Sequence, residues 1–243
     1  MKGYKQYYVN ELGRLDGWRS ELIFVKAIVR RLYNLGLCSK EVVERMADMK
    51  KPYSNKKEYP NVSTSKLAEM MVFMKKDNPE YHRIIYYISR TGRRIEESTQ
   101  IERSDVEWLG IKPVKINIRT STTKKHQHIP LLKLDEKLEQ VIKEANMNSI
   151  RQKSVYLFSN RLGKKCTAGR VRDYLKKISR QITGVEVTPH YFRHRFLTEC
   201  GKANVPLVDV MAIAGIKDMK VVLRHYSHTT TEGLEKVLKQ SYI

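Results

Sequence analysis

The hydrophobic periodicity of this chain departs from helical spacing in only one stretch, and that stretch limits the folds open to it. On both sides of residues 114–131, apolar side chains recur every three or four residues, as in amphipathic helices. Within it, Val114, Ile116 and Ile118 alternate with polar residues, and a further apolar pair follows a polar stretch. That alternation is typical of a β-hairpin with a polar, basic tip. We therefore expect a mostly α protein with a small antiparallel β-sheet, an α+β fold.

Start and stop signals for helices divide the chain into two parts. Helical spacing over 17–35 ends at Gly36, and Ser39 is placed to cap a short helix through Asp48. The next stretch is polar and twice interrupted by proline, which is typical of a linker. We expect a helical segment over 1–50, a linker over 51–62 and a larger domain over 63–243. Its helices are expected to open at Ser63 or Thr64, Asn78-Pro79, Thr188-Pro189 and Pro206, with helical spacing also over 134–146, 168–182, 218–226 and 231–239.

Positive charge is spread over the whole chain. Lys and Arg number 47 and Asp and Glu 26, which gives a net charge of +21. Residues 1–60 contribute 13 − 7 = +6 and residues 61–243 contribute 34 − 19 = +15. A polyanionic partner is the natural inference, because Lys and Arg neutralise phosphates and release counterions. Charge alone leaves duplex DNA, RNA, an anionic membrane surface and a basic protein without such a partner all open.

The chain shows no targeting or cross-linking pattern. No apolar run is long enough to span a bilayer, and the first residues lack the apolar stretch of a signal peptide. Three cysteines at wide spacing argue against both a disulfide framework and a zinc cluster. We expect a cytoplasmic protein, associated with the nucleoid if its polyanion is DNA.

Three short motifs carry candidate chemistry. Thr91-Gly92-Arg93-Arg94-Ile95-Glu96-Glu97 ends one expected helix and starts the next. His190 and Arg193 lie three apart on another expected helix, so their side chains share one face. Tyr226 stands near the C-terminus within Arg-His-Tyr-Ser-His. In this order, the motifs resemble the catalytic domain of the tyrosine recombinases, the phage-integrase family, over roughly residues 60–240.

The resemblance assigns roles to individual residues. Arg94 falls on the family's first arginine and Glu97 on the glutamate that orients its neighbours. His190 and Arg193 fall on the histidine-x-x-arginine pair, and Tyr226 falls on the nucleophile. Two positions depart from the pattern. Lys217 stands where many members have a histidine or tryptophan, and the common spacing for the hairpin lysine lands on Thr122, so Lys124 is our candidate and Lys125 the alternative.

These residue types suit phosphoryl transfer at a DNA backbone. Two arginines can hold both non-bridging oxygens of a phosphodiester with fixed donor forks. Neighbouring cations favour the phenolate of Tyr226, whose free pKa is about 10. His190 can accept the phenol proton or orient the phosphate, and a hairpin lysine can protonate the leaving 5′ oxygen. The resemblance implies a 3′-phosphotyrosine intermediate, formed without ATP or metal.

The resemblance also implies the partners. Members act as tetramers on two DNA duplexes, so we expect double-stranded DNA with a specific site and a homotetramer on it, with a monomer possible when free. Residues 227–243 can hold a neighbouring subunit or pack within their own chain. A short helical segment at the N-terminus is expected to clamp the duplex. Candidate phosphate contacts, with a solvated helix face as the alternative for the first three, are Arg19, Lys26, Arg30, Lys125, Lys164, Lys165, Arg170 and Arg172.

Other functions remain as alternatives. A type IB topoisomerase uses similar chemistry on one strand, and a DNA-binding protein with a decayed active site would keep the charge without the reaction. The pairs His190/His194 and His126/His128 have spacings that metal ligands can have. Arg193 and Arg195 crowd the first pair, and no Glu follows His190 as a zinc protease motif requires. We therefore expect no metal and no cofactor.

Overall fold

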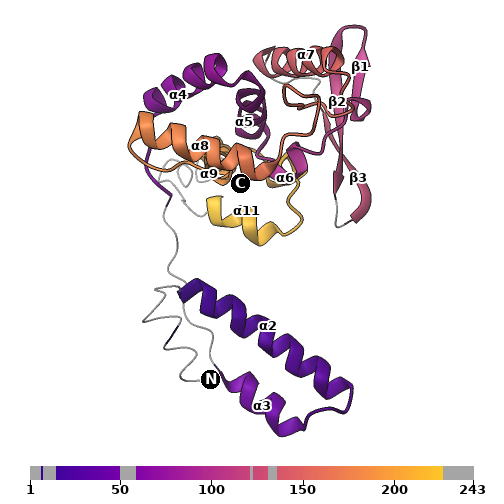
Figure 1. Cartoon of the computed structure of the whole chain (residues 1–243), viewed down its shortest axis with the longest axis vertical. Coiled ribbons are helices and arrows are strands. Elements are labelled where there is room, and N and C mark those ends of the chain that lie inside the picture. Colours follow the sequence, from indigo (N-terminus) through magenta and orange to yellow (C-terminus); the bar gives the residue numbers. More distant parts are fainter. Residues whose placement is uncertain (1–6, 8–14, 50–58, 121–122, 131–135, 227–243) are drawn as a thin grey trace, which may run out of the picture. The chain divides into compact units, whose positions relative to one another are not determined.

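A computed structural model describes residues 7, 15–49, 59–120, 123–130 and 136–226, and it divides the chain into two compact units, 1–58 and 59–243. The described part of the first unit is a helical hairpin of α2 (Leu15–Asn34) and α3 (Lys40–Asp48) (Figure 1). Gly36 adopts the left-handed conformation (φ 72°) that ends α2, and Ser39 occupies the N-cap of α3. Both features agree with the helix signals in the sequence.

The larger unit alternates helices with one small sheet. Its described helices are α4 (Thr64–Asp77), α5 (Pro79–Thr91), α6 (Ile95–Ser98), α7 (Glu136–Arg151), α8 (Ala168–Thr183), α9 (Pro189–Lys202), α10 (Leu207–Ala214) and α11 (Met219–Tyr226), with a 3₁₀ turn, η2 (Arg103–Asp105). The expected caps form where the sequence places them: Ser63 Oγ accepts from the Lys66 amide and Asn78 Oδ1 from the Tyr81 amide. The helix expected over 231–239 and most of the expected linker lie outside the described residues.

The sheet has three antiparallel strands in the order β1 (Val106–Leu109), β2 (Lys112–Thr120), β3 (Thr123–Pro130). The expected hairpin is β2 and β3, which pair Ile116 with Ile129. The sequence pattern did not predict β1. It has only four residues, and its register shifts between Glu107 and Trp108, so it shows little alternation. The mostly α fold with a small antiparallel sheet is confirmed.

Two apolar clusters support the larger unit. Met70 and Met74 of α4 are fully buried, so the methionine stripe of this helix is core, as its spacing indicates. The core continues through α5, α7, α8 and the start of α9, while a second cluster joins α9, α10 and α11 around Leu197 and Val222. Among the described helices, none is both long enough and apolar enough to cross a membrane.

Candidate active site

A cavity of about 300 Å³ lies where the α5–α6 turn meets α8 and the N-terminal end of α9. Two of the motifs seen in the sequence therefore converge on one place, although about 95 residues separate them. The cavity is lined by Arg93, Arg94, Ile95, Glu96, Arg172, Thr188, Pro189, His190 and Arg193. The lining contains four arginines and one glutamate, so its net charge is positive and suits an anion.

The α5–α6 turn is fixed by its glycine. Gly92 adopts φ 63° and its amide donates to Ile88 O at 2.8 Å, which closes the end of α5. A Cβ at this position would stand 2.4 Å from Cδ1 of Phe196 on α9, so the turn lies directly against α9. Thr91 Oγ1 donates to Tyr87 O at 2.8 Å within the same turn. Only glycine fits both the backbone conformation and this close approach.

Arg94 and Arg193 are each anchored through one nitrogen. Arg94 Nη1 donates to Glu97 Oε1 at 2.8 Å and to Gly215 O at 3.3 Å. Arg193 Nη1 donates to Gly92 O and, at 2.7 Å, to Ala214 O. The structure gives Nε and Nη2 of both arginines no partner among the described residues. Each guanidinium thus keeps a donor pair for a phosphate oxygen.

Burial differs between the two arginines. Arg94 is half exposed, whereas Arg193 is 4% exposed. Burial and the nearby charge of Arg94 lower the pKa of Arg193 to about 10, with Glu97 opposing the shift. Arg193 therefore still carries its charge at neutral pH. A buried cation next to another cation gains from an incoming anion, which is the electrostatic condition a phosphate site needs.

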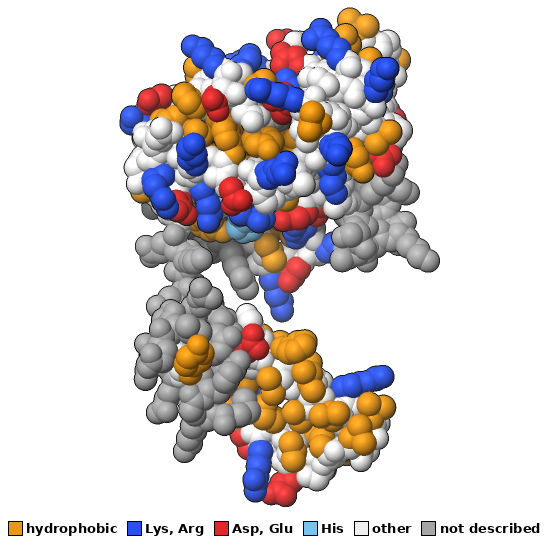
Figure 2. Space-filling view, viewed as in Figure 1, with side chains coloured by type: hydrophobic (Ala, Val, Ile, Leu, Met, Phe, Trp, Pro, Cys, Tyr) orange, Lys and Arg blue, Asp and Glu red, His pale blue; other side chains and the backbone are white. Residues whose placement is uncertain are grey.

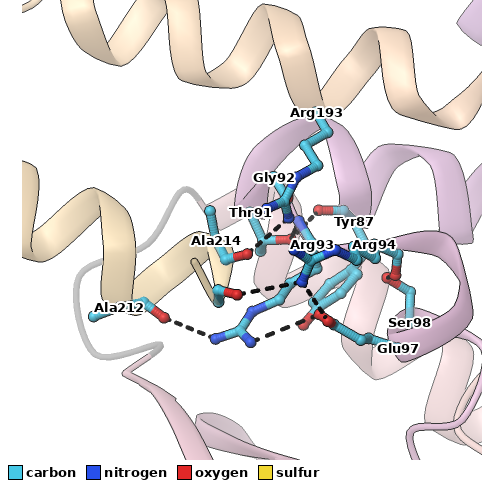
Figure 3. A network of polar contacts seen from close by, with 11 residues as sticks. Tyr87, Thr91, Gly92, Arg93, Arg94, Glu97, Ser98, Arg193, Ala212 and Ala214 are labelled. Atoms are coloured by element: carbon cyan, nitrogen blue, oxygen red, sulfur yellow. Dashed lines mark hydrogen bonds and ion pairs between the residues drawn. The ribbon is translucent and has the colours of Figure 1, made fainter. Parts of the chain in front are cut away.

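Arg93 is a residue whose importance the sequence did not reveal. Its side chain is 0% exposed, although it stands beside half-exposed Arg94 (Figure 3). Arg93 Nη2 donates to Ala212 O at 2.8 Å, and its Nη1 lies 3.8 Å from Glu97 Oε2. Glu97 is therefore shared between the two adjacent arginines, one at each carboxylate oxygen. Burial lowers the pKa of Arg93, while Tyr87 and Glu97 oppose that shift.

His190 stands at the start of α9, on the rim of the cavity. Pro189 occupies the first turn of this helix, as the Thr-Pro signal predicts. The ring of Tyr59 lies 5.9 Å from the His190 ring and 4.1 Å from that of His194. Partial burial, Arg193 and Arg94 lower the pKa of His190, so its imidazole is neutral at pH 7 and can accept a proton. Within the described part of the chain, no three metal-ligating side chains gather.

Arg172 joins the cavity from α8. The sequence predicted a contact to the DNA backbone for Arg172, and the structure shows that it lines the cavity together with residues of the α5–α6 turn. Its Nη2 donates to Glu96 Oε1 at 3.0 Å, across 76 positions of sequence. No local pattern could have predicted this pairing.

The remaining expected catalytic residues are described to different extents. Lys217 is exposed in the segment between α10 and α11 and does not line the cavity. Tyr226 is the last residue of α11, and Lys124 and Lys125 belong to strand β3. The side chains of these three residues lie outside the described part of the structure.

The expected phosphate contacts outside the cavity fall into two groups. On α2, Arg30 is exposed and Arg19 partly so, but Lys26 Nζ donates to Ala47 O and Met49 O, at 3.0 and 2.8 Å, and so closes the end of α3. The second group surrounds the turn before α8. There, Lys164 and Arg170 are exposed, and Lys165 Nζ lies 6.0 Å from the ring centre of Tyr156.

Comparison with known proteins identifies the family. The model of the phage integrase family matches residues 61–232, which is well over half of the chain. The chain therefore belongs to the phage integrase family, and the larger unit has the tyrosine recombinase catalytic fold. The matched region contains the cavity and Tyr226. No curated protein matches the sequence.

Solved structures show the same fold at low identity. A crystal structure of XerA recombinase aligns with a TM-score of 0.58 and 16% identity over 98% of this chain and 81% of its own. A lambda integrase dimer bound to a COC′ core site aligns with a TM-score of 0.71 and 12% identity over 92% and 62%. The Tn1549 transposon integrase in complex with a circular intermediate DNA aligns with a TM-score of 0.61 and 18% identity over 90% and 85%.

Proposed function

We propose that this protein is a site-specific DNA recombinase that cleaves and rejoins strands through a covalent 3′-phosphotyrosine intermediate, without metal or ATP. One observation carries the proposal: Arg94 and Arg193 line one cavity from different elements, and each has guanidinium donors without a partner among the described residues. The cavity also holds His190 and an excess of positive charge. Members of the family that contact DNA, such as the lambda and Tn1549 integrases, support duplex DNA as the partner.

The reaction follows from the residue types at the cavity. The scissile phosphate binds to the free donors of Arg94 and Arg193, which offset the charge that develops on its non-bridging oxygens. Oη of Tyr226 loses its proton to His190 or to water and attacks phosphorus. The bond from phosphorus to the 5′ oxygen breaks, and that oxygen takes a proton from the hairpin lysine, for which Lys124 is our candidate. Attack by another 5′-hydroxyl reverses the step, so the bond energy is retained.

The assembly is part of the proposal. Exchange between two duplexes needs four active subunits, and we propose a homotetramer on DNA. The basic residues of α2 and of the turn before α8 would hold the duplex backbone outside the cavity. Binding should therefore weaken steeply as salt rises.

A trapping experiment tests the chemistry. The protein is incubated in EDTA with a pool of nicked duplexes that carry a randomised central window, and a denaturing gel reports covalent protein–DNA adducts. We expect an adduct on the strand with the free 3′ end, and its sequence would reveal the target site. Tyr226→Phe should form no adduct yet bind DNA with unchanged salt dependence. Tyr33→Phe, which changes an exposed tyrosine of α2, serves as the matched control and should react like the wild type.

The outcomes separate this proposal from its alternatives. DNA binding without any adduct would indicate a decayed active site, and an adduct that survives Tyr226→Phe would exclude this tyrosine as the nucleophile. Relaxation of one supercoiled circle without exchange between two duplexes would indicate a topoisomerase instead.

A further inference from the structure

The largest fully buried side chain of the described residues is a cation, Arg93. Arginine is rarely buried completely unless it is paired, and an apolar residue often serves equally well where only packing is needed. Arg93 also lies between two residues with other tasks: Gly92, which closes α5, and Arg94, which faces the cavity. Its burial therefore calls for a physical explanation beyond core packing.

Arg93 connects two parts of the site. Through Nη2 it holds Ala212 O, and through Nη1 it faces Glu97 Oε2. The end of α10 meets two further arginines, because Ala214 O accepts from Arg193 and Gly215 O from Arg94. Three guanidinium groups thus converge on the carbonyl end of one helix, where the helix dipole favours positive charge (Figure 3). The helix after this end is α11, whose last residue is Tyr226.

The contact with Glu97 has an electrostatic consequence for Arg94. Glu97 is 15% exposed and has two cationic neighbours, Arg94 at 2.8 Å and Arg93 at 3.8 Å. While Arg93 faces Oε2, the carboxylate offers only Oε1 to Arg94. If Arg93 lost its charge, both oxygens could turn to Arg94 and form a bidentate pair with it. A further donor of Arg94, which has no partner among the described residues, would then be occupied within the protein.

We propose that Arg93 is a positioning residue of the strand-cleavage reaction: it holds Glu97 and the end of α10 so that Arg94 keeps its free donors for the phosphate. This inference rests on the proposed function for its link to cleavage. It assigns a task to the residue before the first catalytic arginine. Arg93 is one of the residues that line the cavity, but its side chain is 0% exposed, so we expect it to act through Arg94.

The test compares two buried arginines of the same region. Arg93→Met removes the charge at the turn, and Arg83→Met is the matched control. Arg83 is 9% exposed on α5, its charged neighbours are Glu80 and Glu144, and it does not line the cavity. Both variants should lose thermal stability. Only Arg93→Met should slow single-turnover adduct formation at saturating nicked duplex, by tenfold or more, with the Kd for that duplex changed less than threefold.

Two further variants distinguish positioning from loss of structure. Arg93→Lys, which can keep a positive charge near Glu97, should recover part of the rate. In the Arg93→Met background, Glu97→Gln should also recover part of the rate, because a neutral amide cannot form the bidentate pair with Arg94. A double variant slower than either single variant would overturn the mechanism proposed for Glu97.

A second measurement does not depend on cleavage. Inorganic phosphate serves as the probe, and its binding is followed through the Nε–H signals of Arg94 and Arg193 in ¹⁵N spectra. We expect at least tenfold weaker phosphate binding in Arg93→Met and wild-type binding in Arg83→Met. If wild-type protein formed no adduct but phosphate binding still depended on Arg93, the proposed function would fail and the positioning role would stand. If Arg93→Met matched Arg83→Met in both measurements, the inference would be wrong.

Discussion

The helical hairpin of α2 and α3 and the unit from residue 59 onward differ in how much apolar surface they bury. Among the described residues of the hairpin, only Leu22 and Met46 are buried. Figure 2 shows apolar side chains spread over the visible face of the hairpin. Val25, Val29 and Met49 are partly buried against Leu22 and Met46, whereas several other large apolar side chains are more than 40% exposed. They include Ile23, Phe24, Ile28, Tyr33, Leu35, Leu37 and Val42.

The larger unit has the opposite balance. Its main cluster joins six of the described helices and the sheet, and it includes fully buried residues such as Ile84 and Ile88 on α5, the helix that leads to the α5–α6 turn. A buried side chain contributes about 1.5–3 kcal/mol, whereas ordering one residue costs about 1–2 kcal/mol. Two buried and three partly buried residues offset little of the cost of ordering a hairpin of this length. The cavity therefore depends on the core of its own unit, and we expect the hairpin to be the less stable of the two regions.

Truncation of one core residue in each region should give the largest difference in stability between the two regions. Ile88→Ala leaves a cavity in the main core, so we expect its free energy of unfolding to fall by about 2–5 kcal/mol. Leu22→Ala removes the centre of the hairpin cluster, and we expect it to abolish the helical structure of the hairpin while the main transition stays within about 0.5 kcal/mol. Calorimetry reports the main transition, and hydrogen exchange of the α2 amides reports the hairpin.

The same two variants can also show that the hairpin and the larger unit do not differ in stability in this way. If Leu22→Ala lowered the main transition as much as Ile88→Ala, the two units would unfold as one cooperative body. If wild-type α2 amides exchanged as slowly as those of α5, another surface would already cover the hairpin.

Local signals explain how much of the fold was predictable. The caps at Asn78-Pro79 and Gly36 fix helix ends through contacts within four residues, and they form as the sequence predicts. Strand β1 was not predicted because it is short and irregular. It is formed by pairing with β2, and its own sequence pattern does not indicate a strand. Helix ends with a local cap could thus be inferred, whereas the strand that depends on tertiary pairing could not. The end of α7 was not predicted either, because the helix continues to Arg151, beyond the expected 134–146.

The same distinction holds at the site. The resemblance to the tyrosine recombinases implied that Arg94, His190 and Arg193 would come together, and the cavity contains all three. Spacing could not distinguish Arg93 from its neighbour, because two adjacent arginines carry the same charge and only packing decides which one is buried. Arg172 reaches the cavity through a long-range pair with Glu96, which no local pattern encodes. The catalytic roles of all these residues stay predictions, as do those of Lys124, Lys217 and Tyr226.

A fall in pH should lower the stability of the larger unit more than that of the hairpin, because all seven histidines lie in the larger unit. His82 is 8% exposed, and burial, with Lys75 and Arg83 nearby, lowers its pKa to about 4. The unfolded chain binds this proton below about pH 6.5, so stability is lost as the pH falls from 6.5 toward 4. Between pH 7 and pH 5 we expect protonation of His82 in the unfolded chain to lower the free energy of unfolding by about 2 kcal/mol. Urea unfolding at both pH values should show this loss in the wild type and a smaller one in His82→Gln; equal losses would exclude His82 as the source.

The smallest effect is expected on the surface of the hairpin. Arg45 Nη2 lies 2.6 Å from Glu41 Oε1 on α3, but both side chains are about 70% exposed or more. Water and salt screen such a pair, so Glu41→Gln should change the opening free energy of α3 by no more than about 0.5 kcal/mol, measured by hydrogen exchange. Glu44→Gln, which removes the exposed pair with Lys40 at 3.3 Å, is the matched control. A loss above about 1 kcal/mol in either variant would mean that surface charge, rather than missing burial, sets the stability of the hairpin.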